Sequence, residues 1–352
     1  MDELRARVEQ AKKSLFFSGA RIADHLNSFL NERGRLCEEI GGTHADKIRH
    51  IFLVGSGGSF ASLQTAKYIL DRIINIPSEV VMSYELIWRN YRRLDKDALV
   101  IFSSYSGETE DTVAGLRMAC KRGAGTLAIV GQPESTLARE ADIVIPYANG
   151  AIYEIPILAV LLYAFGLVGC DNLTPDMSAI YNSIFQLPEA AGEASQLEET
   201  VAEAKARRLL SADHIYVLGS GPLSPLAYKL AMSVIMENIR IGGTYSDASE
   251  WRHGPVEALS NIKPNLIALL GTDESRQLTL QTIDFCRQHG SEVLVYDAVE
   301  SANVHPLLTP LVMNSLTQWL VVYSALLRGI TDLDARVFMG HRMLTSTGAS
   351  WP

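Results

Sequence analysis

Residues 51–59 read Ile51-Phe52-Leu53-Val54-Gly55-Ser56-Gly57-Gly58-Ser59, and this stretch decides the fold. Its apolar start is typical of a short buried strand, and the glycines and serines that follow are typical of a tight turn. Residues 61–74 then have the composition of a helix. A strand, a glycine-rich turn and a helix in this order form the repeating unit of a parallel sheet covered by helices.

The same unit recurs along the chain. Further strands are expected at residues 79–82, 98–102, 125–130 and 143–146, and a second set begins at residues 214–218 before another glycine turn. Counting from Gly55 to Gly219, the two turns lie 164 positions apart, which indicates a duplicated α/β domain and not a short repeat. The predicted division is an N-terminal helical segment (1–48), a first α/β domain (49–150), a helical connector (151–211), a second α/β domain (212–330) and a C-terminal tail (331–352).

Composition and charge narrow the class of protein. A chain of 352 residues with 47% hydrophobic and 20% charged residues is typical of a globular protein with two domains. Its formal net charge of −9 argues against a nucleic-acid partner. The four cysteines lack metal-like spacing and are interpreted as free thiols in a reducing cytoplasm. The acidic start does not resemble a signal peptide, and the apolar residues 155–169 are interpreted as a buried helix, so no membrane partner is expected.

Hydroxyl groups are concentrated after the strand at residues 98–102, in Ser103-Ser104-Tyr105-Ser106 and Thr109. Ligands of open parallel sheets bind outside the carboxyl ends of the strands, where helix N-termini favour anions. The loop therefore suits a phosphate monoester. It lacks the lysine of a Walker sequence, and residues 55–59 lack the spacing of a dinucleotide fingerprint, so no cofactor is expected. Taken alone, either loop is better explained as an ordinary helix cap or tight turn.

A second group of candidate residues lies at 249–255, which read Ser-Glu-Trp-Arg-His-Gly-Pro. A carboxylate can move a proton between neighbouring sugar carbons, and histidine exchanges protons near neutral pH. Structural roles are also open: Glu237 can cap or pair at its helix end, Glu250 can pair with Arg252, and His253 can brace the turn before Pro255. No cluster with metal-ligand spacing is present.

These motifs resemble those of a known family. The segment Ser104-Tyr105-Ser106-Gly107-Glu108-Thr109, preceded by Gly57-Gly58-Ser59, resembles the Ser-x-Ser-Gly-x-Thr signature of the sugar isomerase (SIS) domain, and residues 249–255 resemble the Gly-Glu-x-x-His-Gly-Pro segment of double-SIS enzymes. The resemblance covers about residues 45–345. It implies two tandem SIS domains, each a parallel sheet flanked by helices with flavodoxin-like layering. It also implies a sugar-phosphate substrate, with the phosphate held by Ser59, Ser104, Ser106, Thr109 and the backbone of Tyr105.

The resemblance also implies catalytic roles. In double-SIS enzymes a glutamate base lies sixteen residues before the histidine, which is Glu237 in this sequence, and the histidine completes the site of the neighbouring chain. Glu237 is therefore expected to be the base and His253 the proton donor, with Glu250 orienting His253 or contacting the sugar. The resemblance therefore implies that the protein forms a homodimer or a dimer of dimers.

Within the family, the sequence is most similar to deglycases of 6-phosphorylated Amadori adducts such as that of fructoselysine, on residues 221–223, 250–257 and 271–276. The glutaminase domain and the C-terminal lysine of glucosamine-6-phosphate synthase have no counterpart in this sequence. The expected products are glucose 6-phosphate and a free amino acid, with the amine unspecified. An aldose–ketose isomerase, a sugar-phosphate deaminase and a sugar-phosphate sensor remain alternatives. No role is assigned to His305 or to the C-terminal tail.

Overall fold

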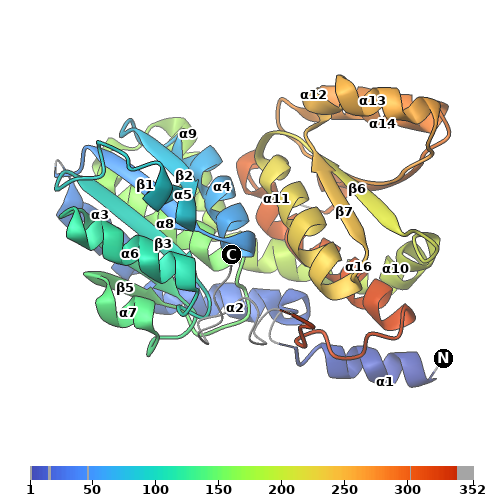
Figure 1. The fold of residues 1–352 in the computed structure, drawn as a ribbon, viewed down its shortest axis with the longest axis horizontal. Helices are drawn as coiled ribbons and strands as arrows, with labels where there is room; N and C mark the ends of the chain where they lie inside the picture. The colour runs from blue at the N-terminus through green and yellow to red at the C-terminus, as the bar shows by residue number, and fades with distance from the viewer. Residues whose placement is uncertain (1, 15–16, 46, 302, 339–352) are drawn as a thin grey trace. The chain divides into compact units, whose positions relative to one another are not determined.

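The computed structural model describes residues 2–14, 17–45, 47–301 and 303–338, and it contains two compact units (Figure 1). The first-sheet unit consists of residues 26–181 with residues 335–338, and the second-sheet unit consists of residues up to 25 and residues 182–334. The first helix of the chain therefore belongs to the same compact unit as the second sheet. The five segments expected from the sequence divide the chain differently, because each of them is continuous in sequence. That division stays a prediction, and residues 339–352 of its tail lie outside the described part.

The first-sheet unit is built on five parallel strands in the order β2-β1-β3-β4-β5. Every residue of the central strands β1 and β3 is buried, which is why their sequences are continuous apolar runs. This strand order is that of flavodoxin-like sheets. The strand bounds are β1 (His50–Gly55), β2 (Ser78–Met82), β3 (Ala98–Ser104), β4 (Gly125–Val130) and β5 (Ile143–Pro146).

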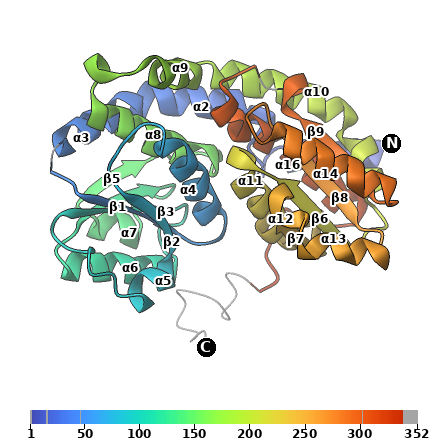
Figure 2. The ribbon, with the colours of Figure 1, turned by 90° about the horizontal axis from the view of Figure 1, so that it is seen from above.

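Helices cover both faces of this sheet (Figure 2). On one face lie α4 (Gly57–Leu70) and α8 (Glu154–Val168), and on the other lie α5 (Ser83–Trp88), α6 (Glu110–Lys121) and α7 (Thr136–Glu140). Phe52, Val100 and Phe102 form the core beneath the second group, together with Leu116 of α6. The layering follows from strands that are apolar on both sides.

Two further helices precede the first strand, with a π-helical turn between them. They are α2 (Ile22–Phe29), η2 (Leu30–Gly34) and α3 (Arg35–His44). Glycines allow α3 to approach α8 closely: a Cβ atom at Gly41 would lie 2.0 Å from the Tyr163 carbonyl oxygen, and one at Gly166 would lie 2.0 Å from the Glu38 carbonyl oxygen. Side chains at these two positions would force the helices apart.

The second-sheet unit has four parallel strands in the order β7-β6-β8-β9. The bounds are β6 (His214–Gly219), β7 (Gly242–Ser246), β8 (Asn265–Leu270) and β9 (Glu292–Asp297). Two parallel sheets flanked by helices confirm the predicted α/β class. Strand β7 was not expected, because its sequence Gly-Gly-Thr-Tyr-Ser lacks an apolar run, as an edge strand can.

The longest helices of the second-sheet unit are α10 (Leu187–Arg208) and α16 (Thr309–Leu327), which pack against each other, and α16 also packs against α1 (Asp2–Ala11). By length and composition alone, residues Pro306–Leu327 could cross a membrane, but 89% of their apolar window is buried in the structure. The remaining elements of the chain are η1 (Gly19–Arg21), η3 (Cys170–Asn172), α9 (Pro175–Ile184), η4 (Gly221–Leu223), α11 (Ser224–Tyr228), η5 (Lys229–Ile239), α12 (Ala248–Trp251), α13 (Gly254–Glu257), η6 (Ala258–Ser260), α14 (Arg276–Gln288), α15 (Ala298–Ser301) and η7 (Pro306–Leu308).

Candidate functional site

The loop between β3 and α6 holds most of the predicted phosphate-binding residues. Ser104 is buried, its Oγ accepts a hydrogen bond from the Gly107 amide at 3.0 Å, and it lies 3.1 Å from Oγ1 of Thr109. Gly107 has a φ of +63°, and a Cβ atom there would lie 2.0 Å from Oγ of Ser135. The loop is therefore held in one shape by its own hydrogen bonds and by a position that only glycine can occupy.

The outer part of the same loop is open to solvent. Ser106 is exposed, and its Oγ accepts a hydrogen bond from the Glu108 amide at 3.3 Å. Thr109 is the N-cap residue of the twelve-residue helix α6, but its side chain makes no capping bond to the helix backbone. Hydroxyl groups and the positive end of a helix dipole therefore meet at this point, and both favour an anion.

The glycine turn after β1 lies beside this loop, because β1 and β3 are hydrogen-bonded neighbours and both run toward the same edge. Gly57 has a φ of +56°, and a Cβ atom at Gly57 or Gly58 would meet nothing within 4 Å. The space next to the turn is therefore open. Ser59 lies half-buried in the first turn of α4. The structure thus brings Ser59 and the hydroxyl loop to one edge of the sheet.

Tyr105 has a structural part in this loop. Its carbonyl oxygen accepts hydrogen bonds from the Gly131 and Gln132 amides, both at 3.0 Å. Its ring meets that of Tyr147 edge to face, with the ring centres 6.0 Å apart. A Cβ atom at Gly131 would lie 2.2 Å from the Tyr105 ring, so the ring packs directly on the backbone of the next loop. The predicted use of its backbone N–H for phosphate stays a prediction.

A network of hydrogen bonds holds the glycine turn in place. The sequence did not predict this network. Ser56 Oγ donates to Oδ2 of Asp111 at 2.6 Å and lies 3.1 Å from Oγ of Ser83, which in turn lies 2.9 Å from Oγ1 of Thr112. These bonds tie β1, α5 and α6 together at the carboxyl edge. An acidic residue in the first turn of a helix was the only sequence signal for Asp111.

Tyr153 and Glu154, which the sequence places at the start of the apolar helix, lie inside the first-sheet unit. Tyr153 is 1% exposed and its hydroxyl lies 2.7 Å from Oγ1 of Thr65, while Glu154 is 0% exposed. Burial raises the pKa of Tyr153, with smaller effects from Thr65 and Glu154. Burial likewise raises the pKa of Tyr147, with further contributions from Tyr105 and Glu154. Both tyrosines therefore stay protonated, and Glu154 is a buried carboxyl group near them.

In the second-sheet unit, Glu237 lies half-buried near the end of η5, which is wound as a π-helix and not as the expected α-helix. The helix stops at Arg240, whose φ of +62° is left-handed. Glu250 and His253 are exposed. Asp247 caps the short helix α12 by accepting from the amide and the hydroxyl of Ser249, at 2.8 and 2.6 Å.

Strand β7 separates Glu237 from His253 along the chain. It begins five residues after Glu237, at Gly242, and ends seven residues before His253, at Ser246. A strand of this length spans roughly 16 Å. The His253 amide donates to the Glu250 carbonyl at 3.0 Å, but within the described chain the His253 side chain makes no hydrogen bond or ion pair. No hydrogen bond or ion pair therefore joins Glu237 to His253 within the described part of one chain.

His305 has a structural place. Its Nδ1 accepts from the Leu307 amide at 3.3 Å at the start of η7, and its own amide donates to Oγ of Ser183 at 2.7 Å. Among the described residues, no three histidine, cysteine, aspartate or glutamate side chains are grouped so that they could hold a metal ion. Of the cysteines, Cys37 and Cys286 are buried free thiols and Cys120 is an exposed one.

Comparison with known proteins agrees with this architecture. Residues 46–165 match the SIS domain. The fructoselysine 6-phosphate deglycase of Escherichia coli is 31% identical over 296 residues, covering 83% of this chain and 86% of the relative. The fructosamine deglycase FrlB of Bacillus subtilis is 32% identical over 286 residues, covering 76% of this chain and 84% of the relative.

Solved structures share the whole architecture. A Bacillus subtilis crystal structure named as that of a phosphosugar isomerase superposes with a TM-score of 0.77 at 28% identity, covering 92% of this chain and 98% of its own. The class of the protein is defined by three observations together: the two parallel sheets, the hydroxyl loop at a helix N-terminus and these relatives. The chain belongs to the SIS domain family, and it is an enzyme of that family.

Proposed function

We propose that the protein is a deglycase that hydrolyses a 6-phosphorylated Amadori adduct, fructoselysine 6-phosphate or a close analogue, to glucose 6-phosphate and a free amino acid. The observation that carries the proposal is the likeness to the Escherichia coli fructoselysine 6-phosphate deglycase over 83% of the chain. The Bacillus subtilis fructosamine deglycase adds independent support. The reaction runs in the cytoplasm.

The phosphate of the substrate binds at the carboxyl edge of the first sheet. Ser59, Ser104, Ser106 and Thr109 donate hydroxyl hydrogen bonds, and the Tyr105 backbone adds an N–H. The preformed loop and the start of α6 support this assignment, because donors fixed before binding lose little entropy on binding. The open space beside Gly57 and Gly58 leaves room for the phosphate.

The chemistry requires a proton shuttle. An Amadori adduct carries its carbonyl at C2 and its amine on C1. Glu237 removes a proton from C1 and returns one to C2, while the C2 oxygen gains a proton and the amine nitrogen loses one. The adduct thereby becomes an imine at C1. Water adds to this imine, and the C1–N bond breaks to give the aldehyde and the amine. Carbon undergoes no net oxidation, because C1 is oxidised while C2 is reduced.

His253 supplies protons for ring opening and for the departing amine, and Glu250 orients His253 or contacts the sugar. We infer that His253 acts in the site of a neighbouring chain. The exposure of His253, which forms no hydrogen bond or ion pair with Glu237 in the described chain, supports this arrangement. The protein is therefore proposed to be a homodimer or a dimer of dimers with a two-fold axis near His253.

An aldose–ketose isomerase is the second candidate, and the Bacillus subtilis structure named as a phosphosugar isomerase favours it. It uses the same base and the same phosphate site. Incubation with fructoselysine 6-phosphate and, separately, with fructose 6-phosphate distinguishes the two. A deglycase releases lysine and glucose 6-phosphate from the first substrate, whereas an isomerase converts the second and releases no amine. No turnover of either substrate would contradict both.

A further inference from the structure

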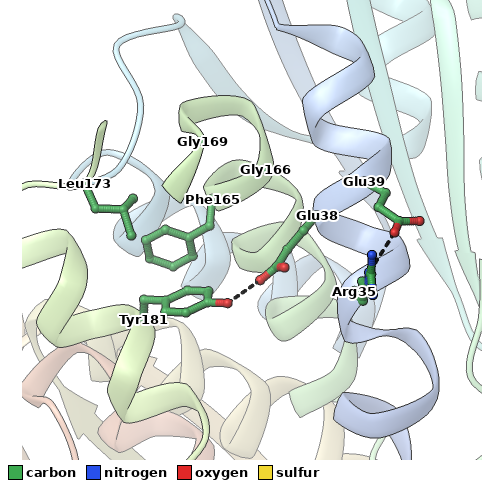
Figure 3. Close-up of a pocket in the computed structure, with 8 residues that line it drawn as sticks. All are labelled: Arg35, Glu38, Glu39, Phe165, Gly166, Gly169, Leu173 and Tyr181. Atoms are coloured by element: carbon green, nitrogen blue, oxygen red, sulfur yellow. Dashed lines mark hydrogen bonds and ion pairs between the residues drawn. The ribbon is translucent and has the colours of Figure 1, made fainter. Parts of the chain in front are cut away.

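The first-sheet unit contains a pocket at the C-terminal end of α8 (Figure 3). Its volume is about 260 Å³, and it is formed by α3, the last turn of α8, and the chain from Gly169 to Tyr181. Helix α8 has fifteen residues, which is a length of roughly 22 Å. The pocket is therefore separate from the candidate phosphate site.

One wall of the pocket is apolar. The rings of Phe165 and Tyr181 meet edge to face, with centres 5.0 Å apart and planes at 74°. Leu173 lies beside them, and two glycines of the α8 end complete the lining without side chains (Figure 3). Such a surface favours an aliphatic stem, which gains dispersion and loses contact with water there.

The opposite wall carries three charged side chains of α3, namely Arg35, Glu38 and Glu39 (Figure 3). Nε of Arg35 donates to Oε1 of Glu39 at 2.8 Å, but the two side chains are 89% and 60% exposed. An ion pair in this setting contributes only about 0–1 kcal/mol. This ion pair is therefore easily broken, and Arg35 and Glu39 can each pair with a ligand instead.

Glu38 is held by a hydrogen bond from a tyrosine, whereas Glu39 is held by the ion pair with Arg35. The Tyr181 hydroxyl donates to Oε1 of Glu38 at 2.7 Å, which joins the apolar wall to the charged one (Figure 3). This hydrogen bond fixes the direction of the carboxylate without neutralising its charge. Helix α8 ends at Val168, beside the pocket, and the C-terminal end of a helix carries partial negative charge. Both features favour a cationic group.

We propose that this pocket binds a free dibasic α-amino acid of the lysine type. The pocket offers two carboxylates and one guanidinium, and such an amino acid offers two ammonium groups and one carboxylate. Arg35 pairs with the ligand carboxylate, Glu38 and Glu39 pair with its ammonium groups, and the aliphatic stem packs on Phe165. A cavity of about 260 Å³ is slightly smaller than the pockets of about 300–1,000 Å³ that hold drug-sized ligands, which suits a ligand as small as a single amino acid.

This inference goes beyond the proposed reaction and does not require it, because it concerns binding of a free amino acid outside the reaction site. Isothermal titration of the full chain with L-lysine tests it directly. Two analogues serve as probes: L-norleucine lacks the side-chain ammonium and cadaverine lacks the carboxylate. We expect one saturable lysine site per chain and binding of each analogue roughly two- to fivefold weaker, as the loss of one partly exposed charge pair implies.

Variants locate the site. Glu38→Gln and Arg35→Gln each remove one charge and should weaken lysine binding roughly two- to fivefold. Glu134→Gln removes an exposed carboxylate elsewhere in the same unit and should leave it unchanged. Thermal unfolding checks that each variant is folded, and the high exposure of Arg35 makes its replacement safe for folding.

Three results would overturn the proposal: no saturable heat with lysine at tens of millimolar, equal affinity for norleucine, or wild-type affinity in both pocket variants. Displacement of lysine by saturating glucose 6-phosphate would also overturn it, because the lysine would then occupy the reaction site. Lysine binding by a chain that fails to cleave fructoselysine 6-phosphate would reject the deglycase proposal alone, so the two failures are distinguishable.

Discussion

Three hydroxyl residues at the start of α6 differ in what surrounds them. Ser104 is buried and bonded within the loop, Thr109 contacts Ser104, and Ser106 points its hydroxyl toward solvent. Their residue types and order were readable in the sequence, because they match the Ser-x-Ser-Gly-x-Thr signature of the SIS domain. Their division into supporting and exposed groups was not, since it depends on the hydrogen bonds within the loop.

We expect Ser106→Ala to weaken binding of phosphorylated ligands by about ten- to a hundredfold, because a hydrogen bond to a charged group is worth about 1.5–3 kcal/mol. Titration with glucose 6-phosphate measures this. Ser28→Ala removes an exposed hydroxyl of α2 that bonds Glu32 and is the matched control. An unchanged dissociation constant for Ser106→Ala would show that the phosphate binds elsewhere.

Glu237→Gln keeps the shape of the side chain and removes the base. We expect kcat on fructoselysine 6-phosphate to fall by about a hundredfold or more with little change in KM, since the proton is transferred only in the transition state. Glu193→Gln, at an exposed position of α10, should keep wild-type kinetics. Near-normal turnover by Glu237→Gln would remove Glu237 from the mechanism.

At the scale of elements, buried parallel strands were the most predictable feature. Strands β4 and β5 have the bounds expected from their apolar runs, and β3 extends two residues further, to Ser104. Strand β7 was missed, and η5 was expected as an ordinary helix. The pattern of side chains does not show whether backbone hydrogen bonds of a helix join residues four apart, as in an α-helix, or five apart, as in a π-helix. An edge strand such as β7 needs no apolar run, so its sequence shows no strand signal.

The close approach of α3 to α8 makes a paired prediction about neighbouring glycines. A Cβ atom at Gly41 would lie 2.0 Å from the Tyr163 carbonyl oxygen, whereas the nearest atom at Gly42, the Gly166 carbonyl oxygen, is 3.7 Å away. Gly41→Ala should therefore destabilise the protein by about 1–3 kcal/mol through overpacking. Gly42→Ala should be neutral or stabilise it by up to about 1 kcal/mol, because alanine favours the helix.

Urea unfolding of both glycine variants, followed by circular dichroism, provides the measurement. Equal stability of the two variants would mean that the helices are not packed backbone to backbone at Gly41.

At the scale of the whole molecule, the way in which the chain divides into two compact units could not be predicted from the sequence. Two α/β sheets were predicted from two strand-and-turn patterns, but the sequence did not indicate that residues up to 25 pack with residues 182–334. That grouping depends on contacts between distant segments, such as Phe17 with Trp319, whose ring centres are 4.7 Å apart. No local pattern encodes such a pair.

The proposed assembly can be tested by mixing inactive variants. If His253 of one chain serves the Glu237 of another, a Glu237→Gln chain and a His253→Ala chain form a heterodimer with one intact site. Random mixing makes half of the dimers heterodimers, so activity should return to about one quarter of the wild-type value. Each variant alone is the control. No recovery after subunit exchange, or full activity of a monomer, would contradict a shared site.

Partly buried histidines make the stability of the protein depend on pH. Burial lowers the pKa of His25, His44 and His50 below the ordinary value of 6.5. The unfolded chain therefore binds more protons than the folded chain as the pH falls below 6.5. Stability from these groups is complete above 6.5 and is lost as the pH falls through their folded pKa values. Urea unfolding at pH 7.5 and 5.5 should show the lower free energy of unfolding at pH 5.5, and an equal or higher value there would contradict this reading.

The most direct test of the central claim is turnover of fructoselysine 6-phosphate in deuterated water, followed by NMR of the products. The account predicts lysine and glucose 6-phosphate in equal amounts, with deuterium at C2 of the sugar, because Glu237 returns a solvent-exchanged proton to that carbon. Recovery of intact substrate with no free lysine would contradict the deglycase assignment. Release of lysine with only hydrogen at C2 would contradict an exchangeable proton on Glu237.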